Sequence, residues 1–217
     1  MAAGDGILHT IELGDTTSGL AFENGLLPQT VWDHPRNQQL KQMRENMNVL
    51  NPGDQLFVPE RREKQVAKPV DQRHKFKRKG IPEVFRMQFV DYDKTPLANE
   101  PYRLIVDGQI WKTGSLDSEG WVRTPIPAGA RQGEIGIGEG YSGIVLALDF
   151  GYLNPIADLT GVQARLRNLG YFDGAEDGKD SPELREAVRR FRKDRQLPDG
   201  EEIDAALRDE LKKQHLS

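Results

Sequence analysis

A strict alternation of apolar and polar residues runs through the middle of the chain, from residue 101 to residue 127. The first run sends side chains to two opposite faces, as in a half-buried β-strand: Tyr102, Leu104 and Val106 on one, and Arg103, Ile105 and Asp107 on the other. Asp107-Gly108 is a two-residue hairpin signal, residues 117–120 mark a second turn, and a third run begins at Trp121. The pattern predicts three successive antiparallel strands at the core of a β-sandwich.

Further strands are expected on both sides of these three. Residues 85–90 alternate in the same way, and residues 144–150 form a mostly apolar run bounded by glycines. Residues 134–137 predict only a weak strand, because glycines crowd this segment. We therefore assign residues 81–156 to a central β-sandwich module.

The N-terminal segment, residues 7–59, shows a different order of elements: strand, helix, helix, strand. A strand over residues 7–13 is followed by three candidate N-caps for the first helix, Asp15, Thr16 and Thr17, and Asn24-Gly25 ends that helix. Pro28 opens the second helix, and the polar residues 37–48 are expected to add a helix of their own. A Pro52-Gly53 turn then leads into a closing strand at residues 55–58.

The C-terminal segment, residues 157–217, predicts a bundle of three short helices. Apolar residues recur there at helical spacing in three stretches: Leu159, Val162, Leu166 and Leu169; then Leu184, Ala187, Val188 and Phe191; then Leu207 and Leu211. Gly170 ends the first helix, Ser181 followed by Pro182 begins the second, and Asp204 is a candidate N-cap for the third.

Residues 60–80 join the first two modules and are rich in basic side chains: Arg61, Arg62, Lys75, Lys77, Arg78 and Lys79. This composition predicts a linker. Its charges are either solvated or contact anionic wall polymers or an acidic partner. His74 stands there without a second candidate metal ligand nearby.

Composition supports several small modules in place of one large enzyme. The chain has 217 residues, of which 36% are hydrophobic and 29% charged, with a net charge of −4. This balance gives no sign of binding to nucleic acid. The absence of cysteine excludes disulfides, Cys-ligated zinc and thiol catalysis. We predict an α+β multidomain fold made of a βααβ module, a β-sandwich module and a three-helix bundle.

The N-terminus bears on the route the protein takes in the cell. The sequence MAAGDGILHT has neither a basic region nor an apolar region of the kind found in a Sec signal, and no run is long enough for a membrane span. We therefore expect a protein made in the cytoplasm without a Sec signal.

The N-terminal module resembles a LysM domain. Gly14, Asp15 and Thr16 fit the family's opening turn, and its characteristic ending is matched by Asn46, Leu50, Pro52, Gly53, Leu56, Val58 and Pro59. LysM domains bind N-acetylglucosamine polymers, chiefly peptidoglycan or chitin. The resemblance implies a groove between the first turn and the loop before the last strand, lined by Gly14, Asp15, Thr16, Thr17, Asn48, Leu50, Asn51 and Pro52.

Such a groove is chemically plausible, because backbone groups of two turns can bind acetamido groups while Leu50 contacts the methyl group. The sequence departs from the family in two places. Residues 35–45 are longer than usual and are able to cover or reshape the groove, and Asn24 stands where an aromatic residue is common. Two alternatives stay open: a glycan-binding module, or a LysM-like fold used only for assembly.

The central module resembles transthyretin-like or immunoglobulin-like modules. The residues that carry this resemblance are Pro96, Leu97, Ala98, Asn99, Pro101, Tyr102, Leu104, Asp107, Gly108, Gly114, Asp117 and Gly120. Modules of this kind occur in spike-associated proteins of type VI secretion and related contractile injection systems, where they are adaptors or spacers. The resemblance implies spike or baseplate proteins as partners.

The C-terminal module resembles the three-helix peptidoglycan-binding domain found on many wall hydrolases. The matching residues are Gln163, Leu166, Leu169, Gly170, Tyr171, Asp177, Gly178, Ala187, Phe191, Leu197 and Gly200. Arg192 replaces a common glutamine, and Ala205 and Ala206 stand where a threonine is usual. The basic residues of the second helix, Arg185, Arg189, Arg192 and Lys193, either meet carboxylates of the wall peptide or form a solvated face.

No catalytic or metal-binding constellation is evident. The four histidines are scattered, no H-E-x-x-H or G-x-S-x-G motif is present, and the glycine run 136–140 opens no helix that would bind phosphate. Asp117 and Glu119 lie in a tight turn, where such residues serve the backbone. We therefore expect a non-catalytic peptidoglycan-binding adaptor of a contractile injection system, with no cofactor. The alternatives are an injected wall-degrading toxin and a purely structural spike or baseplate subunit.

Overall fold

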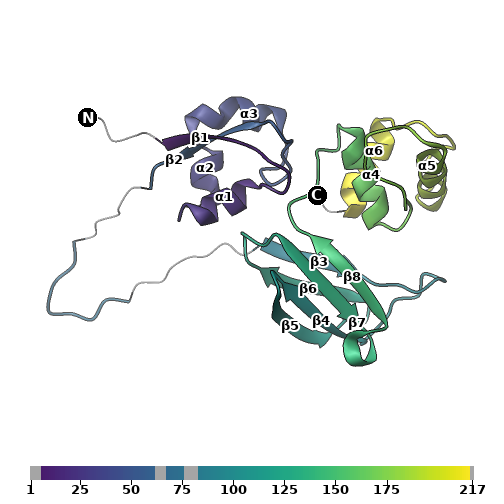
Figure 1. Cartoon of the computed structure of the whole chain (residues 1–217), viewed down its shortest axis with the longest axis horizontal. Coiled ribbons are helices and arrows are strands. Elements are labelled where there is room, and N and C mark those ends of the chain that lie inside the picture. The colour runs from purple at the N-terminus through teal and green to yellow at the C-terminus, as the bar shows by residue number, and fades with distance from the viewer. Residues whose placement is uncertain (1–5, 62–66, 76–82, 216–217) are drawn as a thin grey trace.

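The computed structural model describes residues 6–61, 67–75 and 83–215, and it contains both helices and sheets (Figure 1). Buried apolar residues form three separate hydrophobic clusters, one in each of three consecutive stretches of the chain. We refer to these stretches as the N-terminal unit (6–59), the central unit (83–150) and the C-terminal unit (156–215). No helix in the described ranges is long and apolar enough to cross a membrane.

The N-terminal unit pairs its first and last strands around a set of short helices. β1 (Gly6–Thr10) runs antiparallel to β2 (Gln55–Pro59). Between them come α1 (Thr17–Glu23), α2 (Pro28–Trp32), the 3-10 helix η1 (Pro35–Asn37) and α3 (Gln38–Met43). The predicted order of strand, helix, helix, strand is observed, with an added helix where the polar segment predicted one.

The first strand is shorter than the sequence pattern predicted. It ends at Thr10, and the chain then turns so that Ile11 is buried at 2% exposure whereas Leu13 is 56% exposed. Ile7 is also exposed, so a continuous strand over residues 7–13 is not observed and Ile7, Ile11 and Leu13 do not share a buried face. Ile11 reaches the core because its backbone bonds to the turn before β2, donating to the Asp54 carbonyl and accepting from Gly53 N–H.

The caps of α1 and α2 follow from local chemistry. Of the three candidate caps, Thr16 is the one used: its hydroxyl accepts a hydrogen bond from Gly19 N–H at 2.9 Å. Gly25 follows the helix with a φ of 66°, a conformation that glycine adopts without strain. Pro28 opens α2, where its missing N–H removes no helical hydrogen bond.

The extra length at residues 35–45 braces the loop before β2. Arg44 forms a two-pronged ion pair with Asp54, both bonds measuring 2.8 Å, and Asp54 also accepts from Asn51 N–H at 2.9 Å. Leu40 of α3 is buried in the core of the unit. The extra segment therefore holds one of the two loops expected to form the groove.

The central unit consists of two sheets that share one core. A four-stranded sheet has the order β5-β4-β7-β8, and a two-stranded sheet pairs β3 with β6. The bounds are β3 (Glu83–Gln88), β4 (Pro101–Val106), β5 (Gln109–Ser115), β6 (Trp121–Ile126), β7 (Gln132–Ile137) and β8 (Ile144–Asp149). All pairings are antiparallel. Asp107 and Gly108 join β4 to β5 with positive φ at both positions, as the hairpin signal predicted.

The prediction of three successive paired strands is wrong at the third. β6 leaves β5 and pairs with β3 in the other sheet. The turn at residues 117–120 directs this change, because Phe89 N–H, just after β3, bonds to the Gly120 carbonyl at 2.9 Å. A Cβ at Gly120 would lie 2.3 Å from the Phe89 carbonyl oxygen, so only glycine allows the approach.

β7 is a full inner strand, although its glycines predicted a weak one. It pairs with β4 on one side and β8 on the other. Its glycines make room for neighbouring groups: a Cβ at Gly136 would lie 2.5 Å from the Tyr141 carbonyl oxygen, and one at Gly133 would lie 2.6 Å from that of Ile105. The strand tolerates them because hydrogen bonds on both edges hold its backbone.

The C-terminal unit packs three helices, α4 (Leu159–Asn168), α5 (Pro182–Asp194) and α6 (Ala205–His215), around the apolar residues that the spacing predicted. Ser181 caps α5 by accepting from Leu184 N–H, and Asp204 caps α6 by accepting from Leu207 N–H at 2.9 Å. Gly170 follows α4 with a φ of 78°. The predicted starts and stops of these helices are therefore observed.

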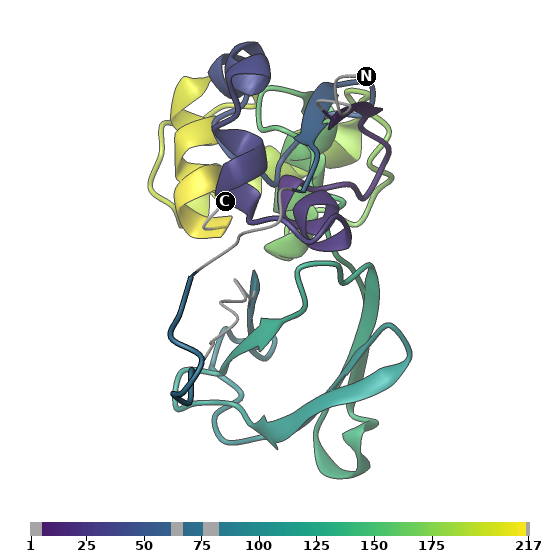
Figure 2. The same cartoon turned by 90° about the vertical axis from the view of Figure 1, so that its left-hand side faces the viewer.

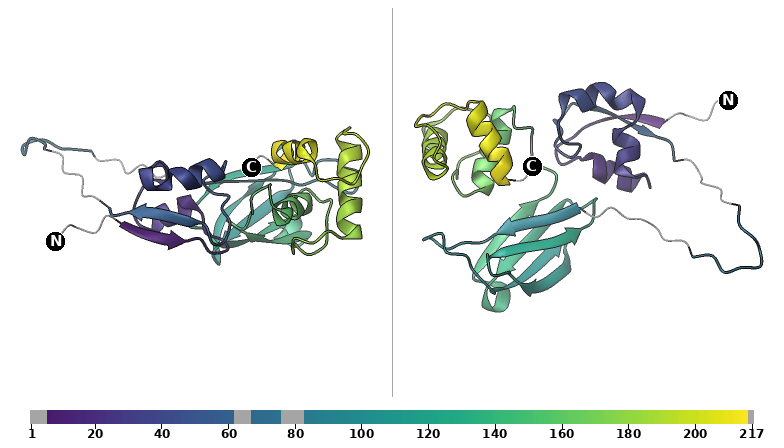
Figure 3. Two further views of the ribbon diagram at one scale, coloured as in Figure 1. Left: turned by 90° about the horizontal axis from the view of Figure 1, so that it is seen from above. Right: turned by 180° about the vertical axis from the view of Figure 1, so that it is seen from behind.

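The three units touch one another. Figures 2 and 3 show the N-terminal and C-terminal units side by side at one end of the sandwich. Asn51 donates to Asp158 at 2.7 Å between those two units, and Lys94 of the central unit pairs with Asp194 of α5. Of the linker's basic residues, Arg61 and Lys75 are exposed, whereas Arg62, Lys77, Arg78 and Lys79 lie outside the described residues.

Candidate functional site

The two loops predicted to face each other in the N-terminal unit do lie together. Thr17 N–H donates to the Met47 carbonyl at 3.3 Å, and Ser18 N–H donates to the side chain of Asn48 at 3.0 Å. One loop carries Gly14, Asp15, Thr16 and Thr17, and the other carries Asn48, Leu50, Asn51 and Pro52. The chain therefore brings all eight predicted residues into one region, which we call the loop pair.

The side chains of these eight residues differ in how far they are exposed to a ligand. Leu50, which we expected to contact an acetamido methyl, is only 5% exposed and belongs to the core with Ile11 and Leu20. Thr17 is fully buried, and its hydroxyl has no hydrogen-bond partner among the described residues. A buried hydroxyl without a partner is disfavoured by about 1–3 kcal/mol.

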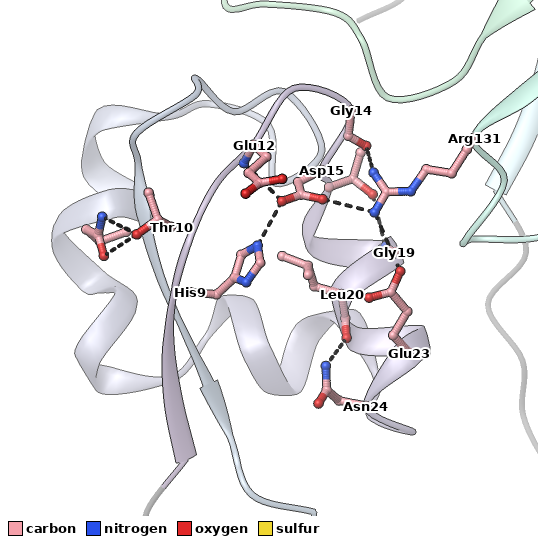
Figure 4. Close-up of polar contacts among 12 residues, drawn as sticks. His9, Thr10, Glu12, Gly14, Asp15, Gly19, Leu20, Glu23, Asn24 and Arg131 are labelled. Carbon is pink, nitrogen blue, oxygen red and sulfur yellow. Dashed lines mark hydrogen bonds and ion pairs between the residues drawn. The ribbon is translucent and has the colours of Figure 1, made fainter.

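Asp15 is the most heavily bonded residue of the loop pair (Figure 4). One carboxylate oxygen accepts from Glu12 N–H at 3.0 Å and contacts His9 Nε2 at 2.8 Å, and the other accepts from Arg131 at 2.9 Å. Burial alone would raise the pKa of Asp15, but the hydrogen bonds from His9, Glu12 and Arg131 together lower that pKa below its ordinary value. Asp15 is therefore held as a carboxylate.

Arg131 reaches Asp15 from the central unit. Its guanidinium also donates to the Gly14 carbonyl and lies 3.5 Å from Glu23 of α1. Its own backbone is fixed in the sandwich, with its N–H bonded to Asp107 and its carbonyl to Phe150 N–H. Sequence reasoning missed Arg131, because it is 116 residues from Asp15 and no local motif marks it.

Other residues cover the remaining parts of the loop pair. Gly14 lies against the Tyr152 ring, since a Cβ on that glycine would be 2.9 Å from the ring, and Thr16 packs against Gly151. Asn48 donates to Glu83 at 3.2 Å, and Asn51 donates to Asp158. Pro52, by contrast, is exposed. Most of the predicted groove therefore faces other parts of the same chain.

An open cavity of about 700 Å³ adjoins Asp15 where the N-terminal unit meets the sandwich. Its walls include Glu12 and Leu13 on one side and Ile105 and Glu134 on the other, with Tyr152 between them. A volume of this size is in the range of small-ligand sites. Arg131 lines the same cavity and joins its two walls.

In the C-terminal unit, the buried polar side chains are used to fix loops. The Gln163 amide donates to the Lys179 carbonyl at 3.1 Å and accepts from Gly178 N–H at 2.8 Å. Arg165, 1% exposed, donates to the carbonyls of Asn154 and Gly161, both at 2.9 Å. These bonds hold α4 against the loop that follows it and against the segment that enters the unit.

α4, α5 and the start of α6 lie within a match to a known domain family. Residues 157–207 match the family model of a putative peptidoglycan binding domain. The prediction of a C-terminal peptidoglycan-binding helical domain is thereby supported, and with it a role in binding the cell wall. Neither the curated proteins nor the solved structures compared with the chain gave a match.

Within this C-terminal unit, Arg192 fits neither of the two roles considered for the basic residues of α5. Arg192 is 2% exposed and donates to the carbonyls of Pro198 and Glu202 at 3.1 and 2.8 Å, so it does not form part of a basic surface. Arg185 pairs with Asp180, and Arg189 pairs with Glu186 and Glu201. Of the four basic residues, Arg185, Arg189 and Lys193 remain at the surface of α5.

The peptidoglycan-binding domain is a binding module and supplies no catalysis by itself. Asp117, which shares a tight turn with Glu119, accepts hydrogen bonds from the N–H groups of Trp121 and Glu119 and from Arg123. The Trp121 N–H contributes most to lowering the pKa of Asp117. It therefore stabilises its turn as a carboxylate. Across the ranges 6–61, 67–75 and 83–215, no cluster of His, Asp or Glu could hold a metal ion.

Proposed function

We propose that this protein is a non-catalytic adaptor that binds peptidoglycan through its C-terminal domain. The family match at residues 157–207 is the observation that carries this function. The match falls on helices with a complete apolar core and with buried polar groups that fix the connecting loops. A rigid scaffold of this kind suits a binding surface, because loops held in place lose little entropy on binding.

The adaptor has a second glycan site in this proposal, at the loop pair of the N-terminal unit. The adjacency of the two predicted loops supports it, because Thr17 bonds to Met47 and Ser18 bonds to Asn48 across them. The glycan would be an N-acetylglucosamine polymer, as the LysM resemblance implies. The residues proposed to form the site are Gly14, Asp15, Thr16, Thr17, Asn48, Asn51 and Pro52, with Leu50 supporting them from the core; Gly14, Asp15 and Thr17 are buried in this closed arrangement.

The central unit serves as a spacer that joins the two ends. Its resemblance to modules of contractile injection systems underlies our proposal that the adaptor works with spike or baseplate proteins at the bacterial cell envelope. Contacts to both neighbouring units, through Arg131 and through Lys94, support a spacer that fixes their relative positions.

Co-sedimentation with purified peptidoglycan sacculi tests the function. We expect the full chain to pellet with sacculi and a chain ending at residue 156 to lose most of that binding, because it lacks the matched domain. Sacculi digested with a muramidase are the control for nonspecific pelleting. Equal binding by the two chains would refute the role of the C-terminal domain. If neither the full chain nor the shortened chain binds sacculi, the result would favour the alternative of a purely structural subunit.

A further inference from the structure

The loop pair is covered by residues of the central unit and of the segment that follows it. We propose that the central unit is an intramolecular lid on the loop pair, held by Arg131, and that the loop pair takes up glycan only when Arg131 releases Asp15. This inference rests on the proposed N-terminal glycan site and adds a control to it. The lid comprises Ala128–Arg131 and the segment from Gly151 to Tyr152.

The bonding of Arg131 shows that its side chain serves the contact between units. Within the described ranges, the partners of its guanidinium are Gly14, Asp15 and Glu23, all in the N-terminal unit. Its backbone, by contrast, is bonded within the sandwich to Asp107 and Phe150. A residue fixed at one end in one unit and bonded at the other end only to a second unit acts as a connection between them.

Packing around Arg131 closes the parts of Gly14 and Thr16 that lie against Gly151 and Tyr152, whereas the cavity lined by Glu12 and Leu13 stays open. A Cβ at Gly151 would lie 2.6 Å from the Gly14 carbonyl oxygen and 3.1 Å from the Thr16 methyl group. A Cβ at Gly14 would lie 2.9 Å from the Tyr152 ring, and one at Gly19 would lie 3.5 Å from the Ala128 carbonyl. Van der Waals contact thus closes this end of the loop pair, so a ligand there has to displace the lid.

The contact is also of a kind that can open. The Arg131 side chain is 39% exposed, so water and salt reach the ion pair that joins the two units. Polar interfaces between units of one chain resemble transient ones and permit relative motion. The N-terminal unit keeps its own core of Ile11, Leu20, Val31 and others when the lid moves away, because none of that core comes from the lid.

Arg131→Ala in the full chain tests the lid, with Arg131→Glu as a stronger variant because it places a third carboxylate near Asp15 and Glu23. Arg123→Ala is the matched control: this arginine is also in the central unit, is 49% exposed, and pairs with Asp117 within its own unit. Amide hydrogen exchange of residues 14–19 and 46–51 reports opening. Isothermal titration with a pentamer of N-acetylglucosamine reports binding.

We expect exchange at the loop pair to be at least tenfold faster in Arg131→Ala than in Arg123→Ala, and faster still in Arg131→Glu. Affinity for the pentamer should rise in the same order, because apparent affinity is reduced by the fraction of molecules that are closed. Exchange and affinity equal to those of Arg123→Ala would overturn the lid. Faster exchange with no binding of the pentamer would overturn the glycan step, while sacculus binding through residues 157–207 stays intact.

Discussion

Replacing Arg192 by methionine removes a cation from the interior of the C-terminal unit while keeping much of its volume. The side chain is 3% exposed and lies at the end of α5. It donates to the Pro198 and Glu202 carbonyls and pairs with Asp204 at 2.8 Å, so one guanidinium holds the whole connection from α5 to α6. The variant leaves those two carbonyls without their donor.

The structure allows the size of the effect to be worked out. Two hydrogen bonds from a charged donor are each worth about 1.5–3 kcal/mol. The pair with Asp204 adds little, because Asp204 is 49% exposed and its charge is screened. Against this, Arg192 Nε is buried without a partner among the described residues, and methionine relieves that penalty of about 1–3 kcal/mol. The net loss of local stability is therefore centred on about 2–3 kcal/mol.

Native-state hydrogen exchange of the full chain measures this loss, because it gives a free energy of opening for each helix. Amides in α5 and α6 should lose about 2–3 kcal/mol of protection in Arg192→Met. Arg189→Met is the matched control. Arg189 lies on the same helix, is 51% exposed and pairs with Glu186 and Glu201, so it should lose less than about 1 kcal/mol. A loss in Arg192→Met no larger than in Arg189→Met would refute the reasoning.

Two further predictions concern the protonation of His215 in α6 and the packing of Gly136 in β7. Burial, with Arg165 and Arg86 nearby, lowers the pKa of His215 to about 4, so the folded unit keeps it neutral while the unfolded chain takes up a proton near pH 6.5. The free energy of unfolding should therefore fall by up to about 3 kcal/mol as pH drops from 6.5 towards 4. In His215→Gln, the melting temperature should depend less on pH over this range. A variant with the same pH dependence as the unchanged protein would contradict this account. Gly136→Ala should destabilise β7 by about 1–3 kcal/mol, because the added Cβ meets the Tyr141 carbonyl. Unchanged exchange of β7 amides would count against that steric account.

Features decided within one turn of chain could be predicted from the sequence. Thr16, Pro28, Ser181 and Gly170 mark helix ends because a cap or a positive φ involves only the next few residues. The Asp107-Gly108 hairpin is of the same kind. The apolar spacing of the C-terminal helices was equally informative, because each stripe repeats several times within its own helix.

Features decided by distant parts of the chain could not be predicted. The departure of β6 to the other sheet depends on the close contact between Gly120 and Phe89, which no local pattern encodes. β7 looked weak because the space that Gly136 leaves for Tyr141 is visible only once the strand is folded. Arg192 looked like one more basic residue of a helix face, since its acceptors belong to the following loop.

The candidate site also combines features set by local sequence with features set by distant parts of the chain. The two loops of the N-terminal unit could be predicted from a motif that spans their own sequence. Burial of Leu50 and the cover supplied by Arg131 and Tyr152 depend on how the units pack together.

The order of events during synthesis follows from the sequence distances between the contacts described above. The core of the N-terminal unit draws on residues 11–58, so this unit can fold as soon as its own strands have left the ribosome. The bonds that cover it come much later in the chain: 116 residues separate Asp15 from Arg131, and 107 separate Asn51 from Asp158. Contacts between residues so far apart in the sequence form slowly, and they form after the local contacts. Every newly made copy therefore passes through a stage in which the loop pair is folded and uncovered.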